Sequence, residues 1–599
     1  MQTDQARYAH WAAACRFLPF TDAAYRAWTG AEASRCEKDH PALRAELEAL
    51  AWGAGMSFAI ADTGSDEALH ATMASLAAQD CRRFDVVVAC AAPRMEAVSR
   101  ALSSVRDAVR VRVVAAEGPA STLALQALAF AQACEPWFGV IAAGDRLASH
   151  AVSSVQLTLA KWSDAAVVYA DEDWIGHDGV RCKPRFKSAW DPEAQLGFDL
   201  LDGLCLMKRT QILEAGGLRA EFEPAARYDL HCRVALALHC SQIRHIPSVL
   251  YHRHAPAVTD AAETLRAVEE YAAAARRVAA QAASRQAGVA VEVLPSPIAG
   301  FINHVRRPLP TPAPRVSVLV PTRDRAQLVR ACMDGLLGKT DYPDLEVIVL
   351  DNDSVEPQTF ALFAELRADP RVRVLRVPGP FNFSSINNAG VQASTGEVLL
   401  FLNNDIEILD GGWLREMVAE AMRPDIGCVG AKLLYGDGTV QHAGVILQRG
   451  PLAMHVCRTD GATDAGMDGR LAGTRNYLAV TGACLAVRRS VFEQVGGFDS
   501  EHLAVAYNDI DLCLKVSDAG YRNICTPFAS LLHLESASRG QDDRSDERQR
   551  QAHHEQTHAS TKWIDRFEHD PYHNPNVQLD WLTGAHLATH AGQPWQLAR

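Results

Sequence analysis

The sequence lacks an excess of positive charge, a long apolar run and a basic leader segment. Its 59 Lys and Arg residues against 72 Asp and Glu residues give a formal net charge of −13. This charge argues against a general nucleic-acid binder, because such proteins need cations to neutralise phosphates. No run reaches about 18 consecutive apolar residues, so we expect no membrane span. Residues 1–20 show no basic segment followed by an apolar one, so we expect no secretory signal.

Disulfide motifs are missing as well. The 15 cysteines are odd in number and include no C-x-x-C pair. Cys90, Cys205, Cys428 and Cys484 lie inside apolar runs, as buried thiols do. These features favour a reduced, cytoplasmic protein. A membrane-bound substrate would then be met at the inner face of the membrane, by peripheral association.

What the sequence does contain is an alternation of apolar runs and helical patterns that occurs twice. Apolar runs alternating with helices are typical of βαβ units in a mainly parallel sheet, so we expect an α/β protein with two tandem sheets. In the first half the predicted strands are 56–61, 84–90, 111–115 and 137–142, and the predicted helices are 66–79 and 121–133. In the second half the strands are 316–320, 345–350, 372–377 and 398–402, and the helices are 326–335 and 384–393.

Four segments follow from this repetition. We expect a helical N-terminal extension at 1–50, a first α/β domain at 51–258 and a second at 315–599 that ends in a helical tail. Between them, 259–314 is predicted as a linker that contains a long Ala-, Arg- and Glu-rich helix and a proline-rich connector.

Polar or acidic residues follow all four predicted strands of the second half. They are Thr322 after the first strand, Asp351 and Asp353 after the second, the segment 381–390 after the third, and Asn403-Asn404-Asp405 after the fourth. Each alone could cap a helix or form a turn. Because carboxyl ends of parallel strands share one edge of a sheet, the four together favour a ligand site there.

The order of motifs resembles a known family. The series VSVLVPTRDR, DNDS, FNFSSINNAG, FLNNDIEIL, GGFD, NDIDL and HLESASRG is similar to family 2 glycosyltransferases of the GT-A fold, especially rhamnosyltransferase-like enzymes of O-antigen biosynthesis. The similarity extends from about residue 315 to 576 and includes a late DPYHNPN, in which His573 replaces a tyrosine. The resemblance implies two tandem GT-A domains with Rossmann-like sheets.

The resemblance implies a metal site and a general base. Asp405 matches the last acid of the family's DxD motif, whose first acid is Asn403 here, and His533 matches a second ligand for Mg²⁺ or Mn²⁺. Asp509, in a segment where Asn508 replaces the usual glutamate, matches the catalytic base of inverting transferases. The alternatives are a hydrogen-bonded histidine at His533 and a helix cap at Asp509.

Other positions match the family's nucleotide-sugar site. The residues that the resemblance assigns to this binding are Pro321, Thr322, Asp351, Asp353, Asn387, Gly390, Asn404, Thr481, Gly482 and Arg539. His442, in a Q-H-A-G motif, matches a narrower subfamily but receives no role.

The first half resembles the same fold with its chemistry reduced. Of the acidic cluster only Asp145 remains, Arg227 occupies the base position and cannot accept a proton, and His252 stands where a metal ligand would lie. We therefore expect a degenerate domain that scaffolds, dimerises or grips the acceptor glycan. The alternative is a second active site that uses Asp171, Glu172 or Asp173, in a bifunctional enzyme.

The expected function is transfer of a sugar, with inversion, from a nucleoside-diphosphate sugar to a hydroxyl of a bacterial surface polysaccharide or lipid-linked glycan. dTDP-rhamnose is favoured over UDP-linked sugars as the donor, and a homo-oligomer is possible. A non-catalytic glycan-binding scaffold remains an alternative. A dehydrogenase would need a G-x-G-x-x-G turn after its first strand, and a nucleotidyltransferase a glycine-rich loop with a lysine; the second half has Pro-Thr-Arg-Asp there.

Overall fold

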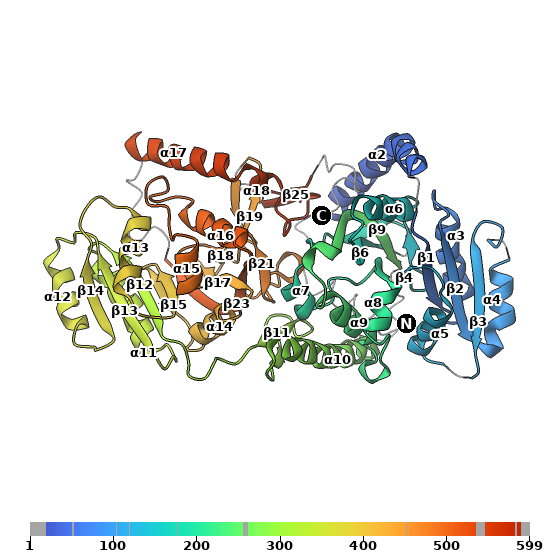
Figure 1. Ribbon diagram of the computed structural model, residues 1–599, viewed down its shortest axis with the longest axis horizontal. Coiled ribbons are helices and arrows are strands. Elements are labelled where there is room, and N and C mark those ends of the chain that lie inside the picture. The colour runs from blue at the N-terminus through green and yellow to red at the C-terminus, as the bar shows by residue number, and fades with distance from the viewer. Residues whose placement is uncertain are drawn as a thin grey trace. The chain divides into compact units, whose positions relative to one another are not determined.

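Two compact units make up the chain in the computed structural model (Figure 1). The structure describes residues 20–50, 53–103, 105–118, 120–176, 178–254, 261–450, 452–534, 546–580 and 584–588. Unit 1 comprises Met1–Val305, Met467–Gly469 and His573–Arg599, and unit 2 comprises Arg306–Gly466 and Arg470–Tyr572. Residues 259–305 and 573–599 thus group with unit 1, whereas the sequence placed them in a linker and in the second domain. Whether the predicted boundaries at 50/51, 258/259 and 314/315 separate independent domains stays a prediction.

Unit 2 is built on a mixed sheet with the strand order β14-β13-β12-β15-β22-β17-β23-β16. The first four strands run parallel, β22 is antiparallel to both of its neighbours, and β17 runs parallel to β23. The strands are β12 (Val316–Thr322), β13 (Leu345–Asp351), β14 (Val372–Arg376), β15 (Val398–Leu402), β16 (Ile406–Ile408), β17 (Ile426–Leu434), β22 (Cys484–Arg488) and β23 (Arg522–His533). Shorter strands are β18 (Val440–His442), β19 (Val445–Gln448), β20 (Leu452–His455) and β21 (Arg475–Tyr477).

Helices cover both faces of this sheet, which explains why its strands are apolar on both sides. Val316, Val318 and Val320 of β12 share a buried core with α11, α12 and α14. On the other face, Leu319 packs toward Gly390 of α13. The helices of unit 2 are α11 (Ala326–Gly338), α12 (Pro357–Leu366), α13 (Phe383–Ala393), α14 (Trp413–Ala421), α15 (Arg489–Gln494), α16 (Asn508–Asp518), α17 (Asp546–Lys562) and α18 (Ile564–Glu568).

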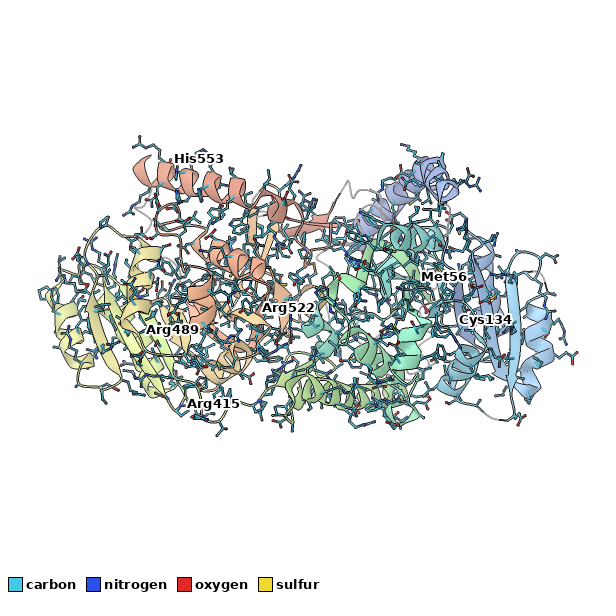
Figure 2. The ribbon with its side chains drawn as sticks, viewed as in Figure 1. Met56, Cys134, Arg415, Arg489, Arg522 and His553 are labelled. Carbon is cyan, nitrogen blue, oxygen red and sulfur yellow. The ribbon has the colours of Figure 1, made fainter. Side chains whose placement is uncertain are left out.

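Unit 1 repeats this topology. Its strand order, β3-β2-β1-β4-β8-β6-β9-β5, corresponds strand for strand to that of unit 2. The strands are β1 (Met56–Ala61), β2 (Phe84–Ala91), β3 (Arg110–Ala116), β4 (Trp137–Val140), β5 (Arg146–Leu147), β6 (Val167–Ile175), β7 (Arg181–Arg185), β8 (Cys205–Lys208) and β9 (Ile243–His254). The predicted α/β class and the duplication of the fold are confirmed. Met56 at the start of β1 is fully buried, as a continuous apolar run predicts (Figure 2).

The helices of unit 1 surround its sheet and extend beyond it. They are α2 (Asp22–Ala49), α3 (Asp66–Ala77), α4 (Met95–Ala101), α5 (Thr122–Gln132), α6 (Ala151–Lys161), α7 (Pro192–Gly197), α8 (Arg209–Glu214), α9 (Ala226–Ala235) and α10 (Ala261–Ala287). Two hairpins, β10 (Glu292–Pro295) with β11 (Asn303–Arg306) and β24 (Val577–Asp580) with β25 (Gly584–Leu587), complete the elements. Among the described residues, every helix is too short or too polar to cross a bilayer.

The four cysteines singled out in the sequence are buried free thiols. Cys90, Cys205, Cys428 and Cys484 are all in the core. Burial raises the pKa of Cys205 to about 12, so its thiol stays protonated at neutral pH. These residues serve packing, as their apolar surroundings predicted.

Candidate active site

Asp405 and His533 meet because two strands pair in a fixed register. β16 runs antiparallel to β23 with Ile406 opposite His533, so the residue just before β16 lies beside the end of β23. Oδ1 of Asp405 is 3.2 Å from Nε2 of His533. Both residues are buried, with exposed fractions of 5% for Asp405 and 9% for His533. Residues 128 positions apart thus form one pair at the carboxyl edge of the sheet.

The hydrogen bonds of His533 place its ring proton on Nδ1 and its lone pair on Nε2. Nδ1 contacts Oε1 of Gln441 at 2.6 Å, which requires the proton on Nδ1. The amide nitrogen of Asn403 lies 3.3 Å from Nε2 and can donate to its lone pair. Oδ1 of Asp405 is buried and has no hydrogen-bond partner among the described residues. A carboxylate oxygen and an imidazole lone pair that face each other are a donor set that fits a divalent cation.

Two further histidines lie next to this pair. Nδ1 of His442 is 3.1 Å from Nδ1 of His455. Burial, then the neighbouring His455 and His533, lowers the pKa of His442 well below its ordinary value, so the ring is neutral. The sequence had shown His442 in its motif without a role, and it gave no signal for His455.

The glycine of the same motif is required by its surroundings. Gly444 has φ of 117°, and a Cβ there would lie 2.4 Å from the ring of Tyr477. A side chain at Gly444 would therefore displace the turn after His442.

Asp509 reaches the same region from α16. Its Oδ2 accepts a hydrogen bond from the backbone N–H of Gly482 at 2.8 Å, and its Oδ1 accepts one from the N–H of Ile510 at 2.8 Å. The backbone N–H of the preceding Thr481 points to Nε2 of His442 at 3.4 Å. The segment 481–482 therefore connects the half-buried Asp509 to the histidine cluster beside Asp405.

Strand pairing explains why segment 481–482 lies there. β15 runs antiparallel to β22 with Leu402 opposite Cys484, and the N–H of Asn403 donates to the carbonyl of Ala483 at 2.9 Å. The structure thus brings Asp405, His533 and Asp509 to one end of the sheet. Their chemical roles stay a prediction.

Several predicted nucleotide residues lie along the adjacent strand ends. The amide of Asn404 donates to Oγ1 of Thr322 at 2.8 Å, which links the ends of β15 and β12. Pro321 is half-buried beside Thr322 at the end of β12. Asp351 is buried at the end of β13, where one oxygen accepts the N–H of Ser354 at 2.9 Å. These residues share the edge that the sequence predicted.

Asp353 stands at the turn after β13 with φ of 58°. Its carboxylate accepts the N–H of Gly379 at 2.8 Å and a hydrogen bond from Arg376 at 3.0 Å. These two contacts, the first above all, lower the pKa of Asp353. A ligand at this exposed carboxylate would compete with Arg376.

The helix α13 holds two of the predicted residues in less accessible places. Asn387 is fully buried, and its amide donates to the carbonyl of Phe383 within the same helix at 2.9 Å. A Cβ on Gly390 would lie 2.8 Å from Leu350, so this glycine allows close packing of the helix on the sheet. Nucleotide contacts for both stay a prediction, and Arg539 lies outside the described residues.

A comparison with family models matches this region. Residues 317–496 match the model described as glycosyl transferase family 2. The chain carries a family 2 glycosyltransferase domain. The resemblance to family 2 glycosyltransferases is confirmed for these residues, which include β12 to β15 and Asp405.

Curated relatives extend beyond the family 2 domain. An uncharacterized protein y4gI of Sinorhizobium fredii is 41% identical over 418 residues, which is 70% of this chain and 46% of the relative. The O-antigen biosynthesis protein RfbC of Myxococcus xanthus is 35% identical over 540 residues, which is 89% of this chain and 41% of the relative. The chain therefore spans less than half the length of these two relatives.

Solved structures include a distant likeness. The mannosyltransferase PcManGT from Pyrobaculum calidifontis, in complex with GDP-Man and Mn²⁺, is 20% identical, with 50% of this chain and 74% of that chain covered and a TM-score of 0.30.

Unit 1 has a different set of contacts at the place of the Asp405 pair. β5 runs antiparallel to β9 with Arg146 opposite His252, so Asp145 stands in the register of Asp405. The carboxylate of Asp145 accepts hydrogen bonds from the hydroxyl of Tyr251 at 2.7 Å and the N–H of His254 at 2.8 Å. Burial raises the pKa of Asp145, against the lowering effect of Arg253 and Tyr251.

His252 is engaged elsewhere in unit 1. Its Nδ1 contacts Asp173 at 2.6 Å, and the same carboxylate accepts hydrogen bonds from Arg181 at 2.6 Å and from Tyr25 of α2 at 2.7 Å. The helix α2 thus covers this carboxylate. The residue at the base position, Arg227, donates to Asp202 at 2.7 Å.

The acids of the alternative second site are buried in ion pairs. Glu172 contacts Arg253 at 2.7 Å and Arg185 at 3.3 Å. Burial alone would raise the pKa of Glu172, but Arg253, Lys187 and Arg185 lower it to about 2. Asp171 contacts His245 at 2.8 Å and accepts a hydrogen bond from Asn574 at 2.8 Å. These contacts occupy the carboxylates as structural partners.

Proposed function

We propose that unit 2 transfers a sugar from a nucleoside-diphosphate sugar to a hydroxyl of a bacterial surface polysaccharide or lipid-linked glycan, with inversion at the anomeric carbon. The observation that carries the proposal is the Asp405–His533 pair at 3.2 Å, which shares one sheet edge with Asp509. The family 2 match over 317–496 supports the reaction class. The name of the Myxococcus xanthus relative supports the class of product.

In this proposal Asp405 and His533 hold Mg²⁺ or Mn²⁺. A cation bound there supplies charge neutralisation to the departing diphosphate. Gln441 keeps the proton of His533 on Nδ1 and so presents Nε2 as a ligand. His442 is neutral and buried next to the site, so it adds no positive charge that would compete with the cation.

Asp509 acts as the general base. The N–H groups of Gly482 and Ile510 each donate to one of its oxygens, which fixes the orientation of the carboxylate. The remaining lone pairs can accept the proton of the acceptor hydroxyl as that oxygen attacks the sugar. The proton ends on Asp509, and the diphosphate leaves on the opposite face.

The nucleotide is proposed to lie along the ends of β12, β13 and β15. Thr322, Asn404 and Asp351 present hydroxyl, amide and carboxylate groups on that edge. dTDP-rhamnose remains the favoured donor over UDP-linked sugars.

For unit 1 we propose a role without transfer, as a scaffold, a dimerisation domain or a grip for the acceptor glycan. The tyrosine and backbone contacts of Asp145 and the cation at Arg227 support this reading. The pairing of Glu172 with Arg253 supports it over a second active site.

The test is metal-dependent hydrolysis and transfer with a panel of nucleoside-diphosphate sugars. We expect one donor to be consumed in Mn²⁺ and not in chelator, and Asp405→Ala to abolish this consumption. Glu407→Ala, which removes a carboxylate two residues away on β16, is the matched control and should keep activity. Equal activity of wild type and Asp405→Ala would contradict the proposal.

A further inference from the structure

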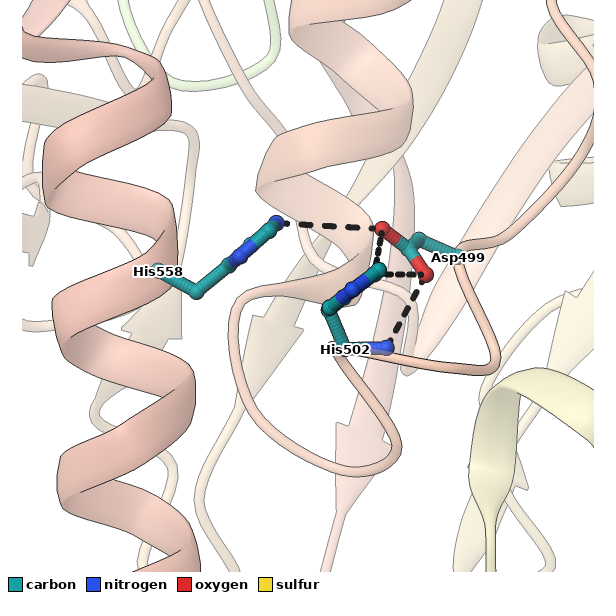
Figure 3. Close-up of side chains that lie close together, drawn as sticks. All are labelled: Asp499, His502 and His558. Carbon is teal, nitrogen blue, oxygen red and sulfur yellow. Dashed lines mark hydrogen bonds and ion pairs between the residues drawn. The ribbon is translucent and has the colours of Figure 1, made fainter.

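A second group of metal-binding side chains lies in unit 2, outside the Asp405 site. Asp499 and His502 belong to the turn after α15, and His558 belongs to α17 (Figure 3). One ligand atom of each lies within 4.8 Å of the others. We propose that these three residues bind one transition-metal ion of the Zn²⁺ class, which fastens α17 to the turn.

The separations fit a shared ion. Oδ2 of Asp499 is 3.3 Å from Nδ1 of His502 and 3.8 Å from Nε2 of His558. Ligand atoms bound tetrahedrally at about 2.1 Å from Zn²⁺ lie about 3.4 Å from one another. The two observed separations bracket this value. Binding also requires the stacked rings to rotate, because an imidazole lone pair lies in the plane of its ring.

The carboxylate is oriented for this task. Oδ1 of Asp499 accepts the backbone N–H groups of Glu501 at 3.1 Å and His502 at 3.0 Å. Nδ1 of His502 lies 3.3 Å from both oxygens, and Oδ2 also lies 3.8 Å from Nε2 of His558.

The two imidazoles lie against each other, and one of their nitrogens lacks a hydrogen-bond partner within the described part of the chain. The rings of His502 and His558 are stacked, with centroids 4.5 Å apart and an interplanar angle of 5°. Nε2 of His558 is shielded from water and has no hydrogen-bond partner among the described residues. A bound ion would give that nitrogen a partner.

Two nitrogens and one oxygen define the class of ion. Imidazole ligands suit Zn²⁺, Ni²⁺ and Co²⁺, whereas Mg²⁺ prefers oxygen ligands. His502 retains 44% side-chain exposure, so an ion can enter from the side of this residue and keep a water ligand. This site is thus chemically distinct from the Asp405 pair.

The site lies on a face of α17 that already contacts the catalytic region. Glu555, one turn before His558, accepts the backbone N–H of Ala506 at 2.6 Å, and Lys562, one turn after it, donates to Asp511 at 2.6 Å. The turn at 499–503 continues directly into the segment that carries Asp509. A bound ion would therefore restrain the segment that positions the proposed base.

The experiment uses the full chain with Asp405→Ala, which removes the other cation site. Chelator-treated protein is titrated with Co²⁺ and followed by visible absorption, and thermal unfolding is measured with Zn²⁺. We expect one equivalent of Co²⁺ to bind and Zn²⁺ to raise the melting temperature. His558→Gln, His502→Gln or Asp499→Asn should each weaken binding at least about tenfold, since losing a ligand costs no less than losing its support.

The matched controls are His553→Gln and His554→Gln, which change exposed histidines on the same helix (His553 in Figure 2). They should bind Co²⁺ like the parent. Melting in chelator checks that each variant folds. Unchanged affinity in His558→Gln and Asp499→Asn, or equal loss in the controls, would overturn the site. Because this readout needs no donor sugar, its failure is distinguishable from failure of the proposed transfer.

Discussion

Asp145 and Asp405 occupy the same register position in two sheets of the same topology, but their partners differ. Oδ1 of Asp405 faces Nε2 of His533 at 3.2 Å, whereas Oδ2 of Asp145 accepts the hydroxyl of Tyr251 at 2.7 Å. In unit 1 the equivalent histidine, His252, binds Asp173 instead. One copy of the fold thus has a carboxylate and an imidazole that face each other, and the other uses the same positions for internal hydrogen bonds.

Replacement of the proposed base should abolish transfer. Asp509→Asn preserves shape but cannot accept a proton, so we expect kcat to fall by about 100- to 10,000-fold. Binding of the nucleoside diphosphate should change little, because the amide oxygen can still accept the N–H of Gly482 and only the hydrogen bond from Ile510 is lost. Steady-state kinetics and calorimetry measure the two effects. The control is Asp518→Asn, at the last residue of the same helix, which alters an exposed ion pair with Arg566 of α18.

Removal of the hydrogen-bond partner of His533 should weaken the proposed metal site without removing a proposed ligand. In the native chain Nδ1 of His533 contacts Oε1 of Gln441 at 2.6 Å, and Gln441→Leu removes this contact. We expect the Mn²⁺ concentration for half-maximal activity to rise about 10- to 100-fold, with kcat at saturating Mn²⁺ little changed. Gln494→Leu, at an exposed position, should leave the Mn²⁺ titration unaltered. A drop in kcat with no shift in the Mn²⁺ titration would mean that Gln441 has another role.

Stability should fall on mild acidification because of His442. Its pKa in the folded chain is well below the ordinary value, so between about pH 6.5 and that lower pKa the unfolded chain binds a proton that the folded chain does not. The contribution of the neutral His442 to the free energy of unfolding is therefore complete above about pH 6.5. It falls as the pH decreases, by at most about 1.4 kcal/mol per pH unit.

His442→Gln should flatten this dependence, although it also changes contacts with His455 and Thr481. Thermal unfolding from pH 7.5 to 5 measures the slope for both proteins. Parallel slopes in the two proteins would show that another group titrates.

Neutralising Glu172 should destabilise unit 1 without removing a catalytic step. Glu172→Gln removes the buried carboxylate that Arg253 and Arg185 share, whereas Arg253 keeps Asp202 and Arg185 keeps Asp468. Because each arginine retains a second carboxylate, we expect a loss below the about 3–5 kcal/mol of a fully broken buried pair. Glu96→Gln, at an exposed pair with Arg100, should cost little. Melting curves and product analysis by mass spectrometry provide the readouts. Loss of a second transferred sugar at temperatures where Glu172→Gln is folded would favour a bifunctional enzyme.

The sequence predicted those parts of the fold that depend on local pattern. The strands at 56–61 and 398–402 end where predicted, because continuous apolar runs are buried on both faces of the sheet. It could not give the register between β16 and β23, which brings Asp405 to His533 only after the chain has folded.

Contacts between segments far apart in the chain could not be predicted from the sequence for the same reason. His455 lies beside His442 through the pairing of β19 with β20, and His558 lies beside His502 through the packing of α17. No repeat or spacing marks these residues in the sequence. Their partners are determined by three-dimensional packing alone.

The interleaving of the chain has a practical consequence for dissecting the protein. Unit 1 includes Met467–Gly469 and the residues from His573 onward. Asp468 accepts a hydrogen bond from Arg185 at 3.2 Å, and Asn574 donates to the buried Asp171 at 2.8 Å. A fragment that ends at Val305 would lack Asp468 and Asn574 and therefore both hydrogen bonds. We expect its free energy of unfolding to be lower than that of the same sheet in the whole chain. The duplicated halves cannot be parted by a single cut.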